Sequence, residues 1–163
     1  MKAVRHNPVT VRVRLTVSMA QRGGFPNPQR RERARVLLSM GDAKAALSLL
    51  AGSCFGAAYD CDYFELLGRA LLECGYVVNA GRFLFLSGVR AAEYEEPISI
   101  FLGRHSDFRN FRQLQSQLPE RVRVLWKLTQ FPSTVAAELR ILGWPEDMQR
   151  EIILRRASRR TMP

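Results

Sequence analysis

The sequence predicts an all-α fold in which antiparallel helical hairpins form a short solenoid or bundle, with additional C-terminal helices. Three observations predict it. The segment LLSMGDAKAALSLL at residues 37–50 reads as helix–turn–helix and returns in looser form as LLECGYVVNAGRFL at residues 71–84, 34 positions later. Further along, apolar residues recur three and four positions apart between proline and glycine breaks. Of the 163 residues, 47% are hydrophobic and 25% charged, a mixture typical of a globular domain with a sizeable core.

The two copies predict two hairpins, over residues 28–52 and 62–87. In each copy a glycine, Gly41 or Gly75, stands where a helix ends in the left-handed conformation that glycine adopts most readily. Small residues of the second copy, Gly68, Ala80 and Gly81, would let helix backbones approach closely. The aligned copies share six identical residues: Arg35/Arg69, Leu37/Leu71, Leu38/Leu72, Gly41/Gly75, Ala46/Ala80 and Leu50/Leu84.

The 34-residue period resembles that of the tetratricopeptide repeat, a unit of two antiparallel helices joined by a tight turn. The second copy has large and small residues at the repeat's usual positions: Phe64, Gly68, Leu71 and Ala80. The first copy departs from the pattern, with Arg30 and Arg33 where large apolar residues are usual. The proline typical of the unit's end is replaced by Ala58 and Ala92. A non-repetitive helical bundle with two matching hairpins is the alternative.

The segment CGYVVNAGRFLFLSG, residues 74–88, also resembles a family of uncharacterised bacterial helical-repeat proteins with an Ala-Gly-Arg-aromatic motif. The motif corresponds to Ala80, Gly81, Arg82 and Phe83, whereas Tyr76 replaces the acidic residue of the family's turn. The resemblance covers residues 30–110 and implies a fold more than a function. We expect Arg82 to lie on the second helix of the hairpin, in an internal ion pair with Glu65 or Glu96 rather than against a ligand.

Helical patterns continue after the hairpins and predict further helices over residues 95–104, 107–118, 120–130, 134–142 and 146–157. Each has a residue near its start that favours helix initiation: Pro97 behind two glutamates, Asp107, Pro119, Pro132 and Pro145. Residues 28–158 are therefore expected to form a single helical domain, followed by a basic tail at 159–163.

Residues 1–27 form a basic N-terminal leader in which apolar and polar residues alternate over 9–17, as in a strand. A lone strand must pair with another chain or stay mobile. A third alternative is that Met19 is the biological start, so that residues 1–18 are dispensable.

The net charge of +10 belongs to the ends of the chain. Residues 1–35 contribute +8 and residues 148–163 contribute +4, whereas residues 36–147 carry −2. Basic ends can contact nucleic acid, but arginines in the last turn of a helix are also explained by its dipole.

No catalytic constellation, cofactor motif or metal-ligand spacing occurs in the sequence. The segment GSCFG places Cys54 in a thiol version of a nucleophile motif, but that motif needs a preceding strand, and here a helical hairpin precedes it. His105 is expected on a helix surface. The odd number of cysteines without a CxxC pair favours reduced thiols, and the apolar runs are too short to span a membrane. A cytoplasmic protein is therefore expected.

These features favour a non-enzymatic protein-protein interaction module that binds a peptide or protein partner in a helical-repeat groove. The resemblance to tetratricopeptide repeats implies the residues that face this groove: Arg31, Arg35, Asp62, Glu65, Arg69 and Glu73. The alternative for these charges is a solvated face on which they pair with one another at i,i+4. The alternative function is a nucleic-acid-associated adaptor that uses the arginine-rich ends, and a third is an enzyme that uses Cys54. The sequence predicts no membrane partner, no metal and no particular oligomeric state.

Overall fold

The computed structural model describes residues 28–51, 59–104, 111–125 and 127–150, and within them it confirms the all-α class. Helices make up the described elements, and the only extended pairing there is an isolated bridge between Lys127 and Asp147. The elements are α1 (Pro28–Ser39), α2 (Ala43–Ala51), α3 (Cys61–Glu73), α4 (Val77–Ser87), α5 (Ala92–Gly103), α6 (Phe111–Gln117), α7 (Glu120–Arg123), the 3-10 helix η1 (Leu128–Gln130) and α8 (Ser133–Ile141).

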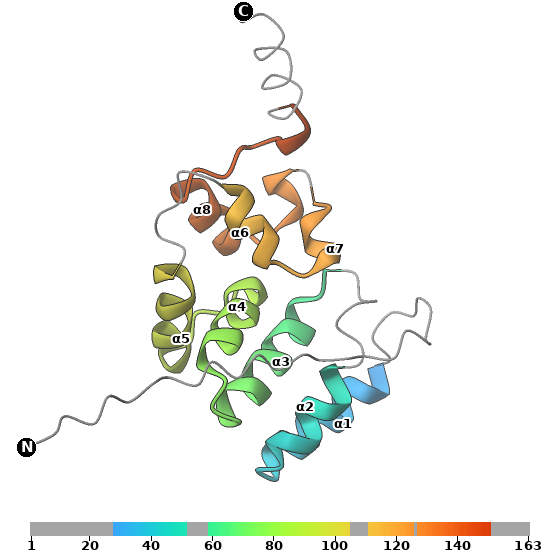
Figure 1. Cartoon of the computed structure of the whole chain (residues 1–163). Helices are drawn as coiled ribbons and strands as arrows, with labels where there is room; N and C mark the ends of the chain where they lie inside the picture. The colour runs from blue at the N-terminus through green and yellow to red at the C-terminus, as the bar shows by residue number, and fades with distance from the viewer. Residues whose placement is uncertain (1–27, 52–58, 105–110, 126, 151–163) are drawn as a thin grey trace, which may run out of the picture.

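Helices α1 to α5 pack in chain order, so that α1 contacts α2, α2 contacts α3, α3 contacts α4 and α4 contacts α5 (Figure 1). The first helices of the two hairpins, α1 and α3, also contact each other. Figure 1 shows these five helices as a row, with α6, α7 and α8 together on one side of it. A contact between α4 and α8 joins the two groups.

The turn between the helices of the first hairpin recurs in the second. After α1, the amides of Gly41 and Asp42 donate hydrogen bonds to the carbonyls of Leu38 and Leu37, at 3.0 and 2.9 Å. The same two bonds follow α3 after a shift of 34 residues, both at 2.9 Å. Gly41 and Gly75 have φ angles of 77° and 81°, which side chains disfavour. The sequence repeat therefore corresponds to a repeated backbone turn.

Equivalent small residues lie at the interior of both hairpins. Ala46 and Ala80 are both 0% exposed, and Leu50 and Leu84 follow them one turn later at 1% and 0%. Gly68 packs against Leu84 so closely that a Cβ atom on this glycine would lie 2.6 Å from the Cγ atom of the leucine. The short side chains thus set how near the helices approach.

Helix α5 begins at Ala92, three residues before the start that the sequence predicts, so Pro97 lies inside the helix. The additional turn brings Tyr94 into the core, where it is 4% exposed. The carbonyl of Pro97 lies against Gly81 of α4, where any Cβ atom would fall on its oxygen. Local signals, two glutamates followed by Pro97, placed the helix start at residue 95, whereas burial of Tyr94 favours an earlier start.

The predicted helix over residues 120–130 is not continuous. Helix α7 ends at Arg123, the backbone is extended at Lys127, and η1 follows from Leu128. The amide of Leu128 donates to the carbonyl of Glu146 at 3.1 Å, and its side chain is fully buried. This contact with a distant segment outweighs the local helical pattern.

The other C-terminal helices lie close to the predicted ranges. Helix α8 matches the prediction for 134–142 to within one residue at each end. Of the helix predicted over 107–118, the part that the structure describes is α6, and the chain is helical again at 148–150. The remaining parts of these predictions, the leader at 1–27 and the tail at 159–163 lie outside the described residues.

Helix α1 is the least buried of the first helices. It buries Ala34 and Leu38, whereas α3 buries seven residues. Val36 on α1 and Met40 directly after it are 48% and 74% exposed, although the equivalent position of Val36 in α3, Ala70, is fully buried. The difference arises because α3 is covered by three helices, α1, α2 and α4, whereas the main contacts of α1 are with α2 and α3 alone.

Candidate interaction face on the first helices

Helix α3 presents a charged stripe whose members are spaced three, four and four residues apart and therefore lie on one face of the helix. The stripe consists of Asp62, Glu65, Arg69 and Glu73. Each of these residues is at least partly exposed to solvent. The structure joins one end of the stripe to α1 and its middle to α5, and we call the surface of α1, α3 and α5 on this side the first-helix face.

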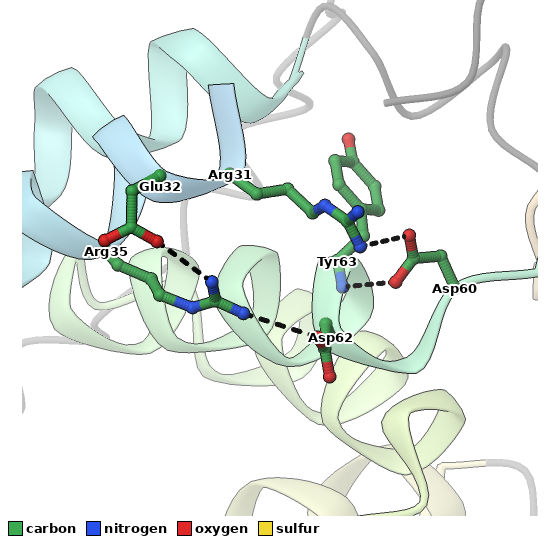
Figure 2. Close-up of polar contacts among 6 residues, drawn as sticks. All are labelled: Arg31, Glu32, Arg35, Asp60, Asp62 and Tyr63. Atoms are coloured by element: carbon green, nitrogen blue, oxygen red, sulfur yellow. Dashed lines mark hydrogen bonds and ion pairs between the residues drawn. The ribbon is translucent and has the colours of Figure 1, made fainter. Parts of the chain in front are cut away.

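Asp60, directly before α3, links that helix to α1. One carboxylate oxygen accepts a hydrogen bond from the amide of Tyr63 at 3.0 Å and caps the helix (Figure 2). The other oxygen accepts from NH1 of Arg31 at 2.8 Å. Both charged side chains are largely buried, with 25% of Arg31 and 21% of Asp60 exposed. Because the carboxylate is held from two sides, Arg31 is fixed in place.

Arg35 makes a second, looser connection between the same helices. Its guanidinium lies between Glu32, at 3.1 Å, and Asp62, at 3.3 Å (Figure 2). All three side chains are about half exposed or more. Ion pairs of this kind contribute little to stability, so a carboxylate from another molecule can replace either partner at small cost. An open hollow of about 420 Å³ lies here, lined by Pro28, Gln29, Arg31, Glu32, Arg35 and Asp62.

Glu65 connects α3 to α5 by accepting a hydrogen bond from the hydroxyl of Tyr94 at 3.0 Å. Burial of the phenol, and then this bond to a carboxylate, raise the pKa of Tyr94 to about 12. The positive charge of Arg69 lowers the same pKa, which indicates that this arginine lies near the Glu65–Tyr94 pair. Tyr94 is therefore a neutral donor at physiological pH.

The structure brings together three of the six predicted groove residues, Arg31, Arg35 and Asp62, around the hollow. Glu65 is engaged with α5, and Glu73 lies exposed at the end of α3. Sequence reasoning missed Glu32, Asp60 and Tyr94 as members of this network. Two of the ion pairs join neighbouring helices and one is spaced i,i+3, so the i,i+4 pairing considered for this face does not describe them.

No family model, curated protein or solved structure matches this chain. The face must therefore be interpreted from its own geometry. Within the described residues, no group of three or more histidine, cysteine, aspartate or glutamate side chains is placed to hold a metal ion. None of the described helices has the length and apolar composition needed to cross a membrane.

The other residues that the sequence analysis considered lie away from this face or outside the described part. For Arg82, the ion pair with Glu65 or Glu96 stays a prediction: its NH1 donates to the carbonyl of Gln117 at 3.1 Å, and the guanidinium lies 4.5 Å from the ring centre of Phe83. Cys54, His105 and the arginine-rich ends lie outside the described residues. At Cys61, burial and the neighbouring carboxylates of Asp60 and Asp62 raise the pKa of the thiol, which makes it a weak nucleophile.

Proposed function

We propose that the protein is a non-enzymatic interaction module that binds a peptide or protein partner across α1, α3 and α5, the first helices of tetratricopeptide-like hairpins. The observation that carries the proposal is the network on this face. Side chains there connect α1 to α3 and α3 to α5, and they include an exposed guanidinium, that of Arg35, at an open hollow. The repeated turn and the shared small core residues support the repeat arrangement.

The network divides into a fixed part and an exchangeable part. Arg31, Asp60 and the Glu65–Tyr94 pair hold the helices at a set distance. Arg35 can change partners, because its own carboxylates are exposed. Charge-assisted hydrogen bonds to a peptide are strong when the recognising groups are held in place beforehand. A preformed face with one exchangeable arginine meets that requirement.

The experiment compares what the tagged protein captures from its native cells with what two double variants capture. Arg35→Glu with Arg69→Glu changes the proposed face. Arg123→Glu with Arg140→Glu is the matched control, because it makes the same charge change at two exposed arginines outside this face. Circular dichroism checks that all three proteins are folded.

A partner that the wild type and the control capture, and that the face variant loses, supports the proposal. Capture of the same partner by all three proteins overturns it. Capture of nucleic acid that disappears at high salt, and on removal of residues 1–27 and 151–163, would favour the nucleic-acid adaptor instead.

A further inference from the structure

The first helices change charge from one end of the row to the other. Helix α1 contains four arginines and one glutamate, a net charge of +3. Helix α3 contains three acidic residues and one arginine, a net charge of −2. Helix α5 contains three glutamates and no basic residue, a net charge of −3. The second helices α2 and α4 each carry +1, so the change of sign belongs to the first helices.

Most of these charged side chains on α1 and α5 are exposed to solvent. On α1, Arg30, Arg33 and Arg35 are exposed. On α5, the glutamates at 93, 95 and 96 are all exposed. The ion pairs of Arg31 and Arg35 connect α1 to α3, and the Glu65–Tyr94 hydrogen bond connects α3 to α5. Packed helices lie about 8–10 Å apart, close to the screening length of about 8 Å at physiological salt, so a ligand meets each helix as a separate charge.

We infer that the partner segment is charge-segregated: it is extended, with carboxylates at the end that lies on α1 and lysine or arginine at the end that lies on α5. This inference rests on the proposed function and adds the chemistry of the partner. If each step from helix to helix is at least about 10 Å, the distance from α1 to α5 is at least about 20 Å, which about six or more residues of extended chain cover. Carboxylates at the acidic end replace Glu32 and Asp62 as partners of Arg35. Lysine or arginine at the basic end pairs with the glutamates of α5.

Charge complementarity is what selects this occupant. A uniformly basic segment would be repelled at α1, and a uniformly acidic one at α3 and α5. A segment with the same residues in alternating order would place a wrong charge on every helix. Of these sequences, only the segregated one places a charge opposite in sign to that of the helix on each of α1, α3 and α5.

The test uses three fluorescent synthetic peptides of about twelve residues, a length that spans the face with a margin at both ends. The first has an acidic block, a Ser-Gly spacer and a basic block. The second has the same composition with the charges alternating, and the third has both blocks basic. Fluorescence anisotropy with the full chain should show that the segregated peptide binds at least about tenfold more tightly than either of the others at low salt. Equal binding of the first two, tighter binding of the basic peptide, or binding of none overturns the inference.

A charge-reversed variant identifies the face. Glu93→Lys with Glu96→Lys should weaken binding of the segregated peptide by about tenfold or more, as expected for the loss of two charge pairs. Glu120→Lys with Glu146→Lys, outside this face, should leave binding unchanged. If the native partner is lost from the Arg35/Arg69 variant while the segregated peptide shows no preference, the proposed function stands and the charge inference fails. If neither effect is seen, both fail.

Discussion

Asp60 shows what a single residue contributes to the first-helix face. Its carboxylate caps α3 through the amide of Tyr63 and also holds Arg31 of α1. The first role has a local signal, because aspartate is a preferred residue directly before a helix. The second has none, because that pair joins positions 29 residues apart and depends on how two helices pack. Local roles of a residue could be predicted, whereas its partners on another helix could not.

Substitution of Asp60 should separate these roles. Asp60→Ala removes the cap and the ion pair, and we expect it to lower the free energy of unfolding by about 1–2 kcal/mol. Asp60→Asn keeps a good capping side chain without the charge and should cost less. Asp62→Asn loses only an exposed pair and should leave the urea midpoint almost unchanged. Equal losses for Asp60→Asn and Asp60→Ala, measured by urea unfolding, would show that the cap contributes nothing.

Tyr94 should make stability depend on alkaline pH. Its pKa rises from the usual value near 10 to about 12 in the folded state, so the unfolded chain loses the phenolic proton first as the pH increases. The stabilisation is therefore complete below about pH 10 and is lost progressively between about pH 10 and pH 12. Urea unfolding at about pH 9 and about pH 11 should show a smaller decline for Tyr94→Phe than for the wild type. Identical declines would contradict this role for the buried hydroxyl.

Among the elements, the crossing of α4 and α5 depends on Gly81. The carbonyl of Pro97 occupies the space that a side chain would need, and the Cβ atom of Phe101 also lies close. The sequence predicted tight packing at this glycine, because glycine within a helix is unfavourable unless a close approach requires it. It did not predict that Gly81 packs against the backbone carbonyl of Pro97. The helix that contains this proline was expected to begin at residue 95, whereas α5 begins at Ala92.

Gly81→Ala should therefore destabilise the protein. The methyl group forces α4 and α5 apart, and we expect a loss of about 1–3 kcal/mol in the free energy of unfolding. Gly103→Ala is the matched control, because it also lies in a helix but a Cβ atom there meets nothing within 4 Å. The control should gain up to about 1 kcal/mol from the better helix propensity of alanine. Thermal unfolding that ranks the two variants in the opposite order would contradict the packing described here.

At the scale of elements, the first four helices lie in the predicted ranges, whereas the helix predicted over residues 120–130 is interrupted. Helices α1 and α2 fall within the predicted range 28–52, and α3 and α4 within one residue of 62–87. Glycines in the turns and apolar residues at helical spacing are local features, so a sequence contains them directly. The break between α7 and η1 depends on the bond from Leu128 to the carbonyl of Glu146, which no local pattern contains.

In the whole molecule, the C-terminal helices attach to the hairpins around the end of α4. Arg90 donates from Nε to Glu138 of α8 at 2.7 Å and from NH2 to the carbonyl of Phe85 at 3.3 Å. Thr134 donates to the carbonyl of Gly88 at 3.0 Å. The rings of Tyr59 and Phe131 meet edge to face beside these bonds. The contacts with Glu138, Thr134 and Phe131 were not predicted, because each joins residues that are more than 40 positions apart.

Arg90→Ala should weaken this attachment. Loss of a partly buried charge-assisted bond should lower the free energy of unfolding by about 1–2 kcal/mol. Arg140→Ala, which removes an exposed ion pair with Glu146 inside the C-terminal group, is the matched control and should have no measurable effect. Calorimetry should show a lower midpoint for Arg90→Ala alone. A similar shift in both variants would mean that the attachment does not depend on Arg90.

The sparse burial of α1 has a consequence for the proposed face. In a stack of hairpins an inner hairpin packs against two neighbours, whereas an outer hairpin packs against only one. Amide protons of α1 and α2 should therefore exchange with solvent sooner than those of α3 and α4. A partner lying across α1 and α3 would supply a second support for the outer hairpin. Slower exchange of these amides would then report occupancy of the face before the partner's sequence is known.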